Sequence, residues 1–301
     1  MLPRAQLVVA LVAIEFAIII GMVVAVRGDQ GTPWFAMGSD AVQTTASGDH
    51  LVEGGGPEVF AAGAHPAVTI DIGYADLTIG TGSAPQIQVS VSKSSAFGPF
   101  RAKSPITATQ AGDTVHVAVG DDPGWVIGDN RMVTLIVPPK TEVTVINGGD
   151  IRASGLRAIA SFKSNNGDIR IDDYDAPRLT VEATRNGDVT LHQIVASHLD
   201  VSSSNGDVEG SDLSVRDGHI SSHDGSVKLG FAPGTDATVT AQAGGRVRVS
   251  GFPATASVPP SGSGNGDDND DSSLRTVRIG AGSGRINVNS GSDDIDLDQE
   301  G

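Results

Sequence analysis

A short phrase recurs along the second half of this chain, and its spacing restricts the fold more than any other feature. The phrase is a glycine, a polar residue and a β-branched aliphatic residue, as in Asn-Gly-Asp-Ile at 166–169 and Asn-Gly-Asp-Val at 205–208. Its glycines are separated by steps of 18, 20, 19, 19, 20 and 39 residues. They are Gly149, Gly167, Gly187, Gly206, Gly225, Gly245 and Gly284. A fixed period of this length indicates one structural unit stacked on itself, which excludes most compact folds.

Aligning the units on these glycines reveals columns of apolar residues. Two positions after the glycine lie Ile151, Ile169, Val189, Val208, Val227, Val247 and Ile286. Seven positions after it lie Leu156, Tyr174, Ile194, Leu213, Ala232 and Phe252. The first column predicts the inward face of a short strand, and the second predicts an apolar corner. The chain is therefore expected to be all-β, a single-stranded parallel β-solenoid with coils of about 19 residues.

The rest of the chain divides by composition. We expect a short cytoplasmic N-terminus at 1–4, a transmembrane helix at 5–26, a flexible tether at 27–64, N-terminal β coils at 65–140, regular repeats at 141–256, an acidic disordered loop at 257–273, and a final coil with an acidic tail at 274–301. The tether and the loop are rich in Gly, Ser and Asp and show no sustained periodicity.

The predicted transmembrane helix rests on an apolar run from Ala5 to Val26 that is interrupted only by Gln6 and Glu15. A helix of this length spans about 33 Å, enough to cross a bilayer. A cleaved signal peptide is the alternative, but it would have a shorter apolar region and a better cleavage site than 24–27. The positive-inside rule places the N-terminus in the cytoplasm and the C-terminal body outside the cell membrane.

The composition of the chain argues against several classes of function. The chain has no cysteine, so it has neither disulfides nor thiolate metal sites. Its net charge of −16 would repel the phosphates of nucleic acid, and we therefore expect no nucleic-acid partner.

The residue after the glycine forms a carboxylate column made of Asp150, Asp168, Asp188 and Asp207. Aligned carboxylates about 5 Å apart repel each other, so a calcium ladder is one interpretation. The other is turn chemistry, in which the glycine supplies a positive φ and the Asn and Asp side chains bond local backbone. A basic column at Arg152, Arg170, Lys228 and Arg248 offsets the acids. We favour turn chemistry and predict no metal and no cofactor.

Catalytic motifs are absent from the sequence. It contains no Gly-x-Ser-x-Gly, no His-Glu-x-x-His and no phosphate loop, and His192, His198, His219 and His223 share no column. The abundant carboxylates leave a paired-acid glycosidase open on residue type, but nothing singles out two of them. We therefore expect that the protein is not an enzyme.

The repeated units resemble a known family. Ser-Asn-Asn-Gly-Asp-Ile-Arg-Ile at 164–171 and Ser-Ser-Asn-Gly-Asp-Val-Glu-Gly at 203–210 are similar to the repeated phrase of the bacterial putative-adhesin family. The stretch Val-Thr-Leu-Ile-Val-Pro-Pro-Lys at 133–140 resembles the Val-x-Val-Pro lead-in of that family. The resemblance covers roughly 66–288 and implies a right-handed β-solenoid at or outside the cell envelope. It implies no catalytic residues.

Together these features predict a membrane-anchored, extracytoplasmic binding or adhesion module that contacts envelope glycans or surface proteins. A self-assembling scaffold of the bactofilin kind, formed by coils that stack end to end, is the alternative. An enzyme that acts on polysaccharides is a third hypothesis, which would require a groove with converging acids.

Overall fold

The computed structural model describes residues 50–51, 57–94, 106–119, 130–252, 257–258 and 274–299. The chain divides into two units, residues 1–43 and 44–301, and every described residue belongs to the second. The predicted N-terminus at 1–4 and the predicted transmembrane helix at 5–26 lie outside the described residues. Within the described ranges, no helix combines the length and hydropathy needed to cross a membrane.

Every described element is a strand, which confirms the predicted all-β class. The strands before the regular repeats are β1 (His50–Leu51), β2 (Glu58–Ala61), β3 (Ala67–Ile72), β4 (Asp76–Thr81), β5 (Gln86–Ser94), β6 (Ile106–Ala111), β7 (Thr114–Val119) and β8 (Asn130–Val137). The repeats contribute β9 (Glu142–Asn147), β10 (Ile151–Ser154), β11 (Ala160–Ser164), β12 (Ile169–Ala183), β13 (Val189–Ser203), β14 (Val208–Ser222), β15 (Val227–Phe231), β16 (Ala237–Ala243) and β17 (Val247–Ser250). The last strands are β18 (Ser257–Val258), β19 (Leu274–Ile279), β20 (Gly284–Ser290) and β21 (Ile295–Gln299).

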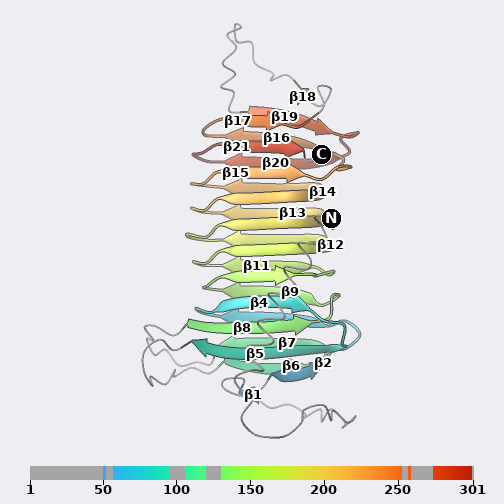
Figure 1. Ribbon diagram of the computed structural model, residues 1–301, viewed down its shortest axis with the longest axis vertical. Coiled ribbons are helices and arrows are strands. Elements are labelled where there is room, and N and C mark those ends of the chain that lie inside the picture. The colour runs from blue at the N-terminus through green and yellow to red at the C-terminus, as the bar shows by residue number, and fades with distance from the viewer. Residues whose placement is uncertain are drawn as a thin grey trace, which may run out of the picture. The chain divides into compact units, whose positions relative to one another are not determined.

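The strands stack as a solenoid-like sheet with two rows (Figure 1). Row A has the order β2-β5-β8-β4-β10-β12-β13-β14-β15-β21-β17, and row B has the order β1-β6-β7-β3-β9-β11-β12-β13-β14-β20-β16-β19-β18. The long strands β12, β13 and β14 bend and contribute to both rows. All pairings between β8 and β17 in row A, and between β7 and β16 in row B, are parallel.

The register of the central coils follows the sequence repeat. Ile169 of β12 pairs with Val189 of β13, which pairs with Val208 of β14, which pairs with Val227 of β15. These side chains are at most 1% exposed, while the residues beside them face outward. The alternation of apolar and polar residues therefore fills the inside of each coil from both rows. The predicted corner column is also buried at Leu156, Tyr174, Ile194 and Leu213.

The two ends of the stack are arranged differently from the sequence-based expectation. The coil β20–β21 was expected to be the final one, but β20 lies between β14 and β16, and β21 lies between β15 and β17. In Figure 1 these strands are seen inside the stack, below β17 and β19. At the other end, the coil β3–β4 lies between β7–β8 and β9–β10 in the same way. The sequence period could not reveal this, because an inserted coil has the same repeat as a terminal one.

Antiparallel strands adjoin both ends of the parallel stack. At one end β5 pairs with β8, and β6 pairs with β7; at the other end β19 pairs with β16. Two segments predicted as irregular take part in these caps. Part of the predicted tether is β2, whose Phe60 is buried, and the start of the predicted acidic loop is β18. Residues 259–273 of that loop lie outside the described residues.

Glycine is required at the turns for a different reason from the predicted one. None of Gly149, Gly167, Gly187, Gly206 and Gly225 has a φ in the left-handed region. A Cβ on Gly206 would instead overlap the carbonyl oxygen of Gly187, and a Cβ on Gly187 would overlap that of Gly167. Glycine is needed here because successive turns touch backbone to backbone.

Candidate binding groove

The predicted carboxylate column is a ladder between coils. Each carboxylate accepts a hydrogen bond on Oδ1 from the main-chain N–H of the matching residue in the next coil. The donors are Asp168 to Asp150 (3.1 Å), Asp188 to Asp168 (3.0 Å), Asp207 to Asp188 (2.9 Å) and Ser226 to Asp207 (2.8 Å). The Asp side chains therefore bond the neighbouring coil and not local backbone, which corrects the turn interpretation in this respect.

The other polar columns also interact pairwise. Arg152 contacts Asp150 of the carboxylate column (3.4 Å), whereas Arg170 contacts Asp172 (2.9 Å), which lies outside that column. The ring of His192 lies 2.8 Å from the Ser211 hydroxyl, measured from Nδ1 to Oγ. In the part of the chain that the structure describes, no three His, Cys, Asp or Glu side chains come together as a metal site.

In the four coils whose turn glycines are Gly149, Gly167, Gly187 and Gly206, the corner is formed by a residue in the left-handed region, six positions after the glycine. Asp173, Gln193 and Asp212 each have φ 54°, and the equivalent Gly155 has φ 78°. The bend turns the next side chain inward, where Tyr174 is 1% exposed. Burial raises the pKa of the Tyr174 phenol above its ordinary value, although a backbone hydrogen bond partly opposes this. The corner is thus fixed by backbone conformation and by a buried plug.

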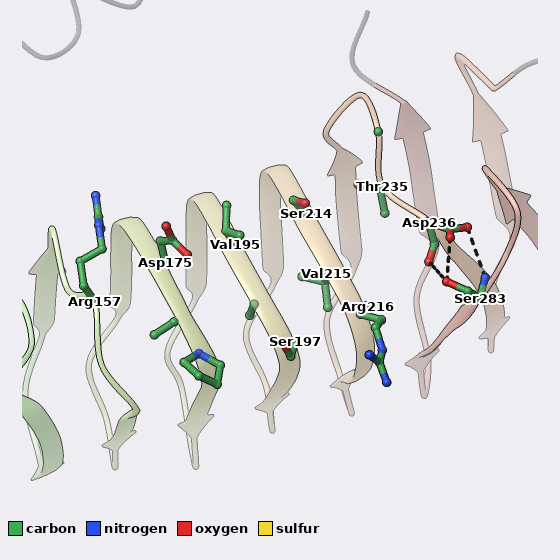
Figure 2. A pocket seen from close by; sticks show the side chains of 14 residues that line it. Arg157, Asp175, Val195, Ser197, Ser214, Val215, Arg216, Thr235, Asp236 and Ser283 are labelled. Carbon is green, nitrogen blue, oxygen red and sulfur yellow. Dashed lines mark hydrogen bonds between the residues drawn. The ribbon is translucent and has the colours of Figure 1, made fainter.

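Beyond this corner the coils form an open groove of about 560 Å³ (Figure 2). Its floor consists of small aliphatic side chains in register, with Ala176 beside Ala196 and Ala196 beside Val215. The outer positions Asp175, Val195 and Ser214 are also in register and line one side. Val195 is 47% exposed and adds aliphatic surface beside the buried floor.

Charged groups lie at both ends of the groove. Arg157 donates from Nη2 to Asp173 Oδ1 (2.7 Å) and from Nη1 to the Asp173 carbonyl oxygen (2.6 Å). At the other end, the Ser283 hydroxyl donates to Asp236 Oδ2 (2.7 Å), as Figure 2 shows. The hydrogen bonds from Ser283 and Gly282 lower the pKa of Asp236. Asp236 therefore stays ionised at neutral pH.

Arg216 contributes a second cation beside the floor. Its side chain is 69% exposed and its Nε donates to Asp217 Oδ2 at 3.1 Å. The groove thus combines an aliphatic strip with carboxylates, hydroxyls and guanidinium groups at its margins. Such a surface can contact the C–H face of an extended polymer along the floor and hydrogen-bond its polar groups at the sides.

The sequence did not indicate this groove. Neither the carboxylate column nor the histidines that the sequence analysis singled out line it. A usable signal was present nine positions after the glycine, where Ala176, Ala196 and Val215 recur. Small side chains at one position of successive coils leave a hollow along the stack.

The stacked coils and the groove define a repeat protein of the β-solenoid-like class, whose surfaces are built by repetition of one unit. The model of the Toastrack DUF4097 family matches residues 66–298, and the chain belongs to this family. This agrees with the resemblance seen in the repeated units. No curated protein matches the chain in sequence.

Several solved structures are similar to the chain. A putative cell adhesion protein from Clostridium sporogenes is 13% identical, with a TM-score of 0.32, over 81% of this chain and 99% of that one. A putative adhesin from Bacteroides fragilis is 10% identical, with a TM-score of 0.44, over 80% and 95% of the two chains. A putative adhesin from Parabacteroides merdae is 12% identical, with a TM-score of 0.33, over the same shares.

Proposed function

We propose that the protein is a binding or adhesion module of the cell envelope, and that the corner groove holds an extended segment of an envelope glycan or surface protein. The observation that carries the proposal is the floor of Ala176, Ala196 and Val215, which runs across three coils in register. Neighbouring coils repeat every 4.7–4.9 Å or so, so one coil after another can offer similar contacts to a repetitive polymer.

The charge of the chain narrows the ligand class. A net charge of −16 repels polyanions, so we expect a neutral or cationic polymer. The carboxylates of Asp175 and Asp236 line the groove and can accept hydrogen bonds from hydroxyl or ammonium groups. No catalytic step belongs to this proposal.

The proposed cellular location of the protein is the one that the sequence predicts. The helix predicted at 5–26 would hold the protein in the cell membrane by a single pass, with its N-terminus in the cytoplasm and its body outside. We also propose that the coils wind in a right-handed sense, as the family resemblance implies. Protease added outside intact cells should cleave the body, and N-terminal sequencing of the mature protein should still find the apolar run.

The groove can be tested by filling it. Ser197→Phe in the full chain should abolish binding to purified envelope polysaccharide or to partner cells, because Ser197 is exposed and lines the groove, so that the ring would fill it. Thr144→Phe is the matched control, since Thr144 is exposed on β9 and does not line the groove. Binding that survives Ser197→Phe in a correctly folded protein would remove the groove from the proposal.

The self-assembling scaffold, named above as the alternative, has less support. It depends on open parallel edges at the ends of the stack. The antiparallel strands β5, β6 and β19 adjoin three of the four row ends, and in the described residues only β17 ends a row as a parallel strand. Filaments of the purified protein in electron micrographs would favour the scaffold over the binding module.

A further inference from the structure

Three Asn-Gly turns stack on one another in the central coils, and they differ in how the glycine nitrogen and the asparagine side chain are held. Asn166, Asn186 and Asn205 are all exposed, and the glycine after each is buried. An Asn-Gly pair can lose ammonia spontaneously. The glycine nitrogen attacks the side-chain carbonyl carbon, a C–N bond forms, and ammonia leaves as its C–N bond breaks. Water then opens the succinimide ring to aspartate or isoaspartate.

In two of the turns, a buried serine holds the glycine nitrogen. Gly167 donates its N–H to Ser164 Oγ at 2.9 Å, and Gly206 donates to Ser203 Oγ at 3.0 Å. Each serine also donates to a glycine carbonyl of the adjacent coil, at 2.9 Å for Ser164 and 3.1 Å for Ser203. The nitrogen must lose its proton and turn toward the asparagine before it can attack. The serine hydrogen bond opposes both changes.

The middle turn lacks this serine. Ala183 occupies the register position of Ser164 and Ser203. The turn from Ala183 to Gly187 is also one residue longer than the turn from Ser203 to Gly206. Within the described part of the chain, the N–H of Gly187 donates no hydrogen bond. A buried main-chain N–H without a partner is rare and costly, so this nitrogen is the least restrained of the three.

The side chain of Asn186 is also activated. Its Oδ1 accepts a hydrogen bond from Nδ2 of Asn205 at 3.1 Å. This bond draws electron density from the carbonyl carbon and stabilises the negative charge that develops on the oxygen during attack. The turn with the free nucleophile therefore also has the more electrophilic amide.

We infer that Asn186 is a site of spontaneous deamidation, and that Ser164 and Ser203 protect Asn166 and Asn205. The reaction adds a negative charge beside the column of Asp168, Asp188 and Asp207. Isoaspartate also adds a carbon to the main chain of the turn. It thereby displaces the N–H of Asp188 from Asp168 Oδ1, its acceptor 3.0 Å away. Deamidation at this turn would loosen the central coils as the protein ages.

The test is to incubate the folded full chain at mildly alkaline pH and to follow the three Asn-Gly pairs of the central coils by peptide mass mapping. We expect Asn186 to convert several-fold faster than Asn166 and Asn205. In the denatured chain, where no turn is held, the three should convert at similar rates. Equal rates in the folded chain, or no conversion at Asn186 while the denatured chain converts, would overturn the inference.

Two substitutions test the role of the serine. Ser203→Ala should accelerate conversion at Asn205 without changing Asn166, and circular dichroism would check that the variant is folded. Ser164→Ala should likewise accelerate conversion at Asn166 without changing Asn205. An unchanged rate at Asn205 in folded Ser203→Ala would show that the serine gives no protection.

Discussion

The main-chain N–H of Asp207 donates a hydrogen bond to Oδ1 of Asp188, which lies 2.9 Å away in the neighbouring coil. The same bond recurs down the column, so the carboxylates join coils through the backbone. Because the main-chain N–H groups already donate to these carboxylates, the column has little need for a cation. It also means that removing one carboxylate should weaken the stack at a defined place.

Asp188→Ala should lower the free energy of unfolding by about 1 kcal/mol, because the N–H of Asp207 loses its acceptor. Asp188→Asn should cost less, since the amide oxygen can still accept. Denaturant titration of the two variants and the wild type checks this order. Calcium should leave the unfolding midpoint of the wild type unchanged. A rise on addition of calcium would support the cation interpretation of the column.

Gly206→Ala should lower the free energy of unfolding by roughly 1–3 kcal/mol, because its Cβ would overlap the carbonyl oxygen of Gly187. Gly73→Ala is the matched control. It also changes a turn glycine without a left-handed φ, but no atom lies within 4 Å of its added Cβ. Thermal or chemical denaturation should therefore separate the two. Equal effects would mean that close approach of the coils is not what requires glycine.

At the left-handed corners, substitutions to glycine and from glycine should change the free energy of unfolding in opposite directions. Gln193→Gly should be neutral or raise the free energy of unfolding by up to about 1 kcal/mol, because φ 54° strains a residue with a Cβ. Gly155→Ala should lower it by about 1–2 kcal/mol, since a residue at φ 78° would acquire that strain and its Cβ would also overlap Oγ1 of Thr81. Chemical denaturation measures both. A stabilising Gly155→Ala would contradict the assignment of this corner.

Acid should loosen the inserted coil β20–β21 first. The backbone N–H of Arg285 and neighbouring Arg216 lower the pKa of Asp217, and hydrogen bonds from Ser283 and Gly282 lower that of Asp236. The N–H of Arg246 and the Arg248 guanidinium lower the pKa of Asp294. These groups stabilise the fold above their ordinary pKa, and the stabilisation is lost as pH falls through the lowered values.

The measurement compares the wild type with a variant in which Asp217, Asp236 and Asp294 are replaced by Asn. The difference in free energy of unfolding should be largest near neutral pH. It should shrink as the pH falls below about 4, the ordinary pKa of Asp, and through the lowered pKa values of the folded protein. A difference that is the same at pH 7 and pH 3 would show that ionisation of these groups does not hold the coil.

The central coils could be predicted from sequence because their signals are local. The alternation around Ile169, Val189 and Val208 fixes which side chains face inward, and a single period fixes the pairing of neighbouring coils. The column from Leu156 to Leu213 was also predicted as buried. At the next coil the pairing shifts by one residue, so that Phe231 and not Ala232 meets Leu213.

The placement of the terminal coils and the site could not be predicted in the same way. Parallel β-pairing is set by which edges meet in space, and Ile286 can pair equally well with strands on either side. The groove depends on the absence of side-chain volume at Ala176 and Ala196, which produces no polar motif. The role of the turn glycines was missed because close approach between coils is a property of two distant segments.

The inserted terminal coils also limit how such a protein can change in length. A unit added at either end would have to displace β3–β4 or β20–β21 from between two neighbours, and it would disturb the antiparallel strands beyond them. A duplicated central coil, such as 187–205, would pair only with coils of similar sequence. It would leave the antiparallel strands at both ends of the stack unchanged. Longer or shorter variants of this chain should therefore arise by internal duplication or deletion, which would lengthen or shorten the groove by one coil at a time.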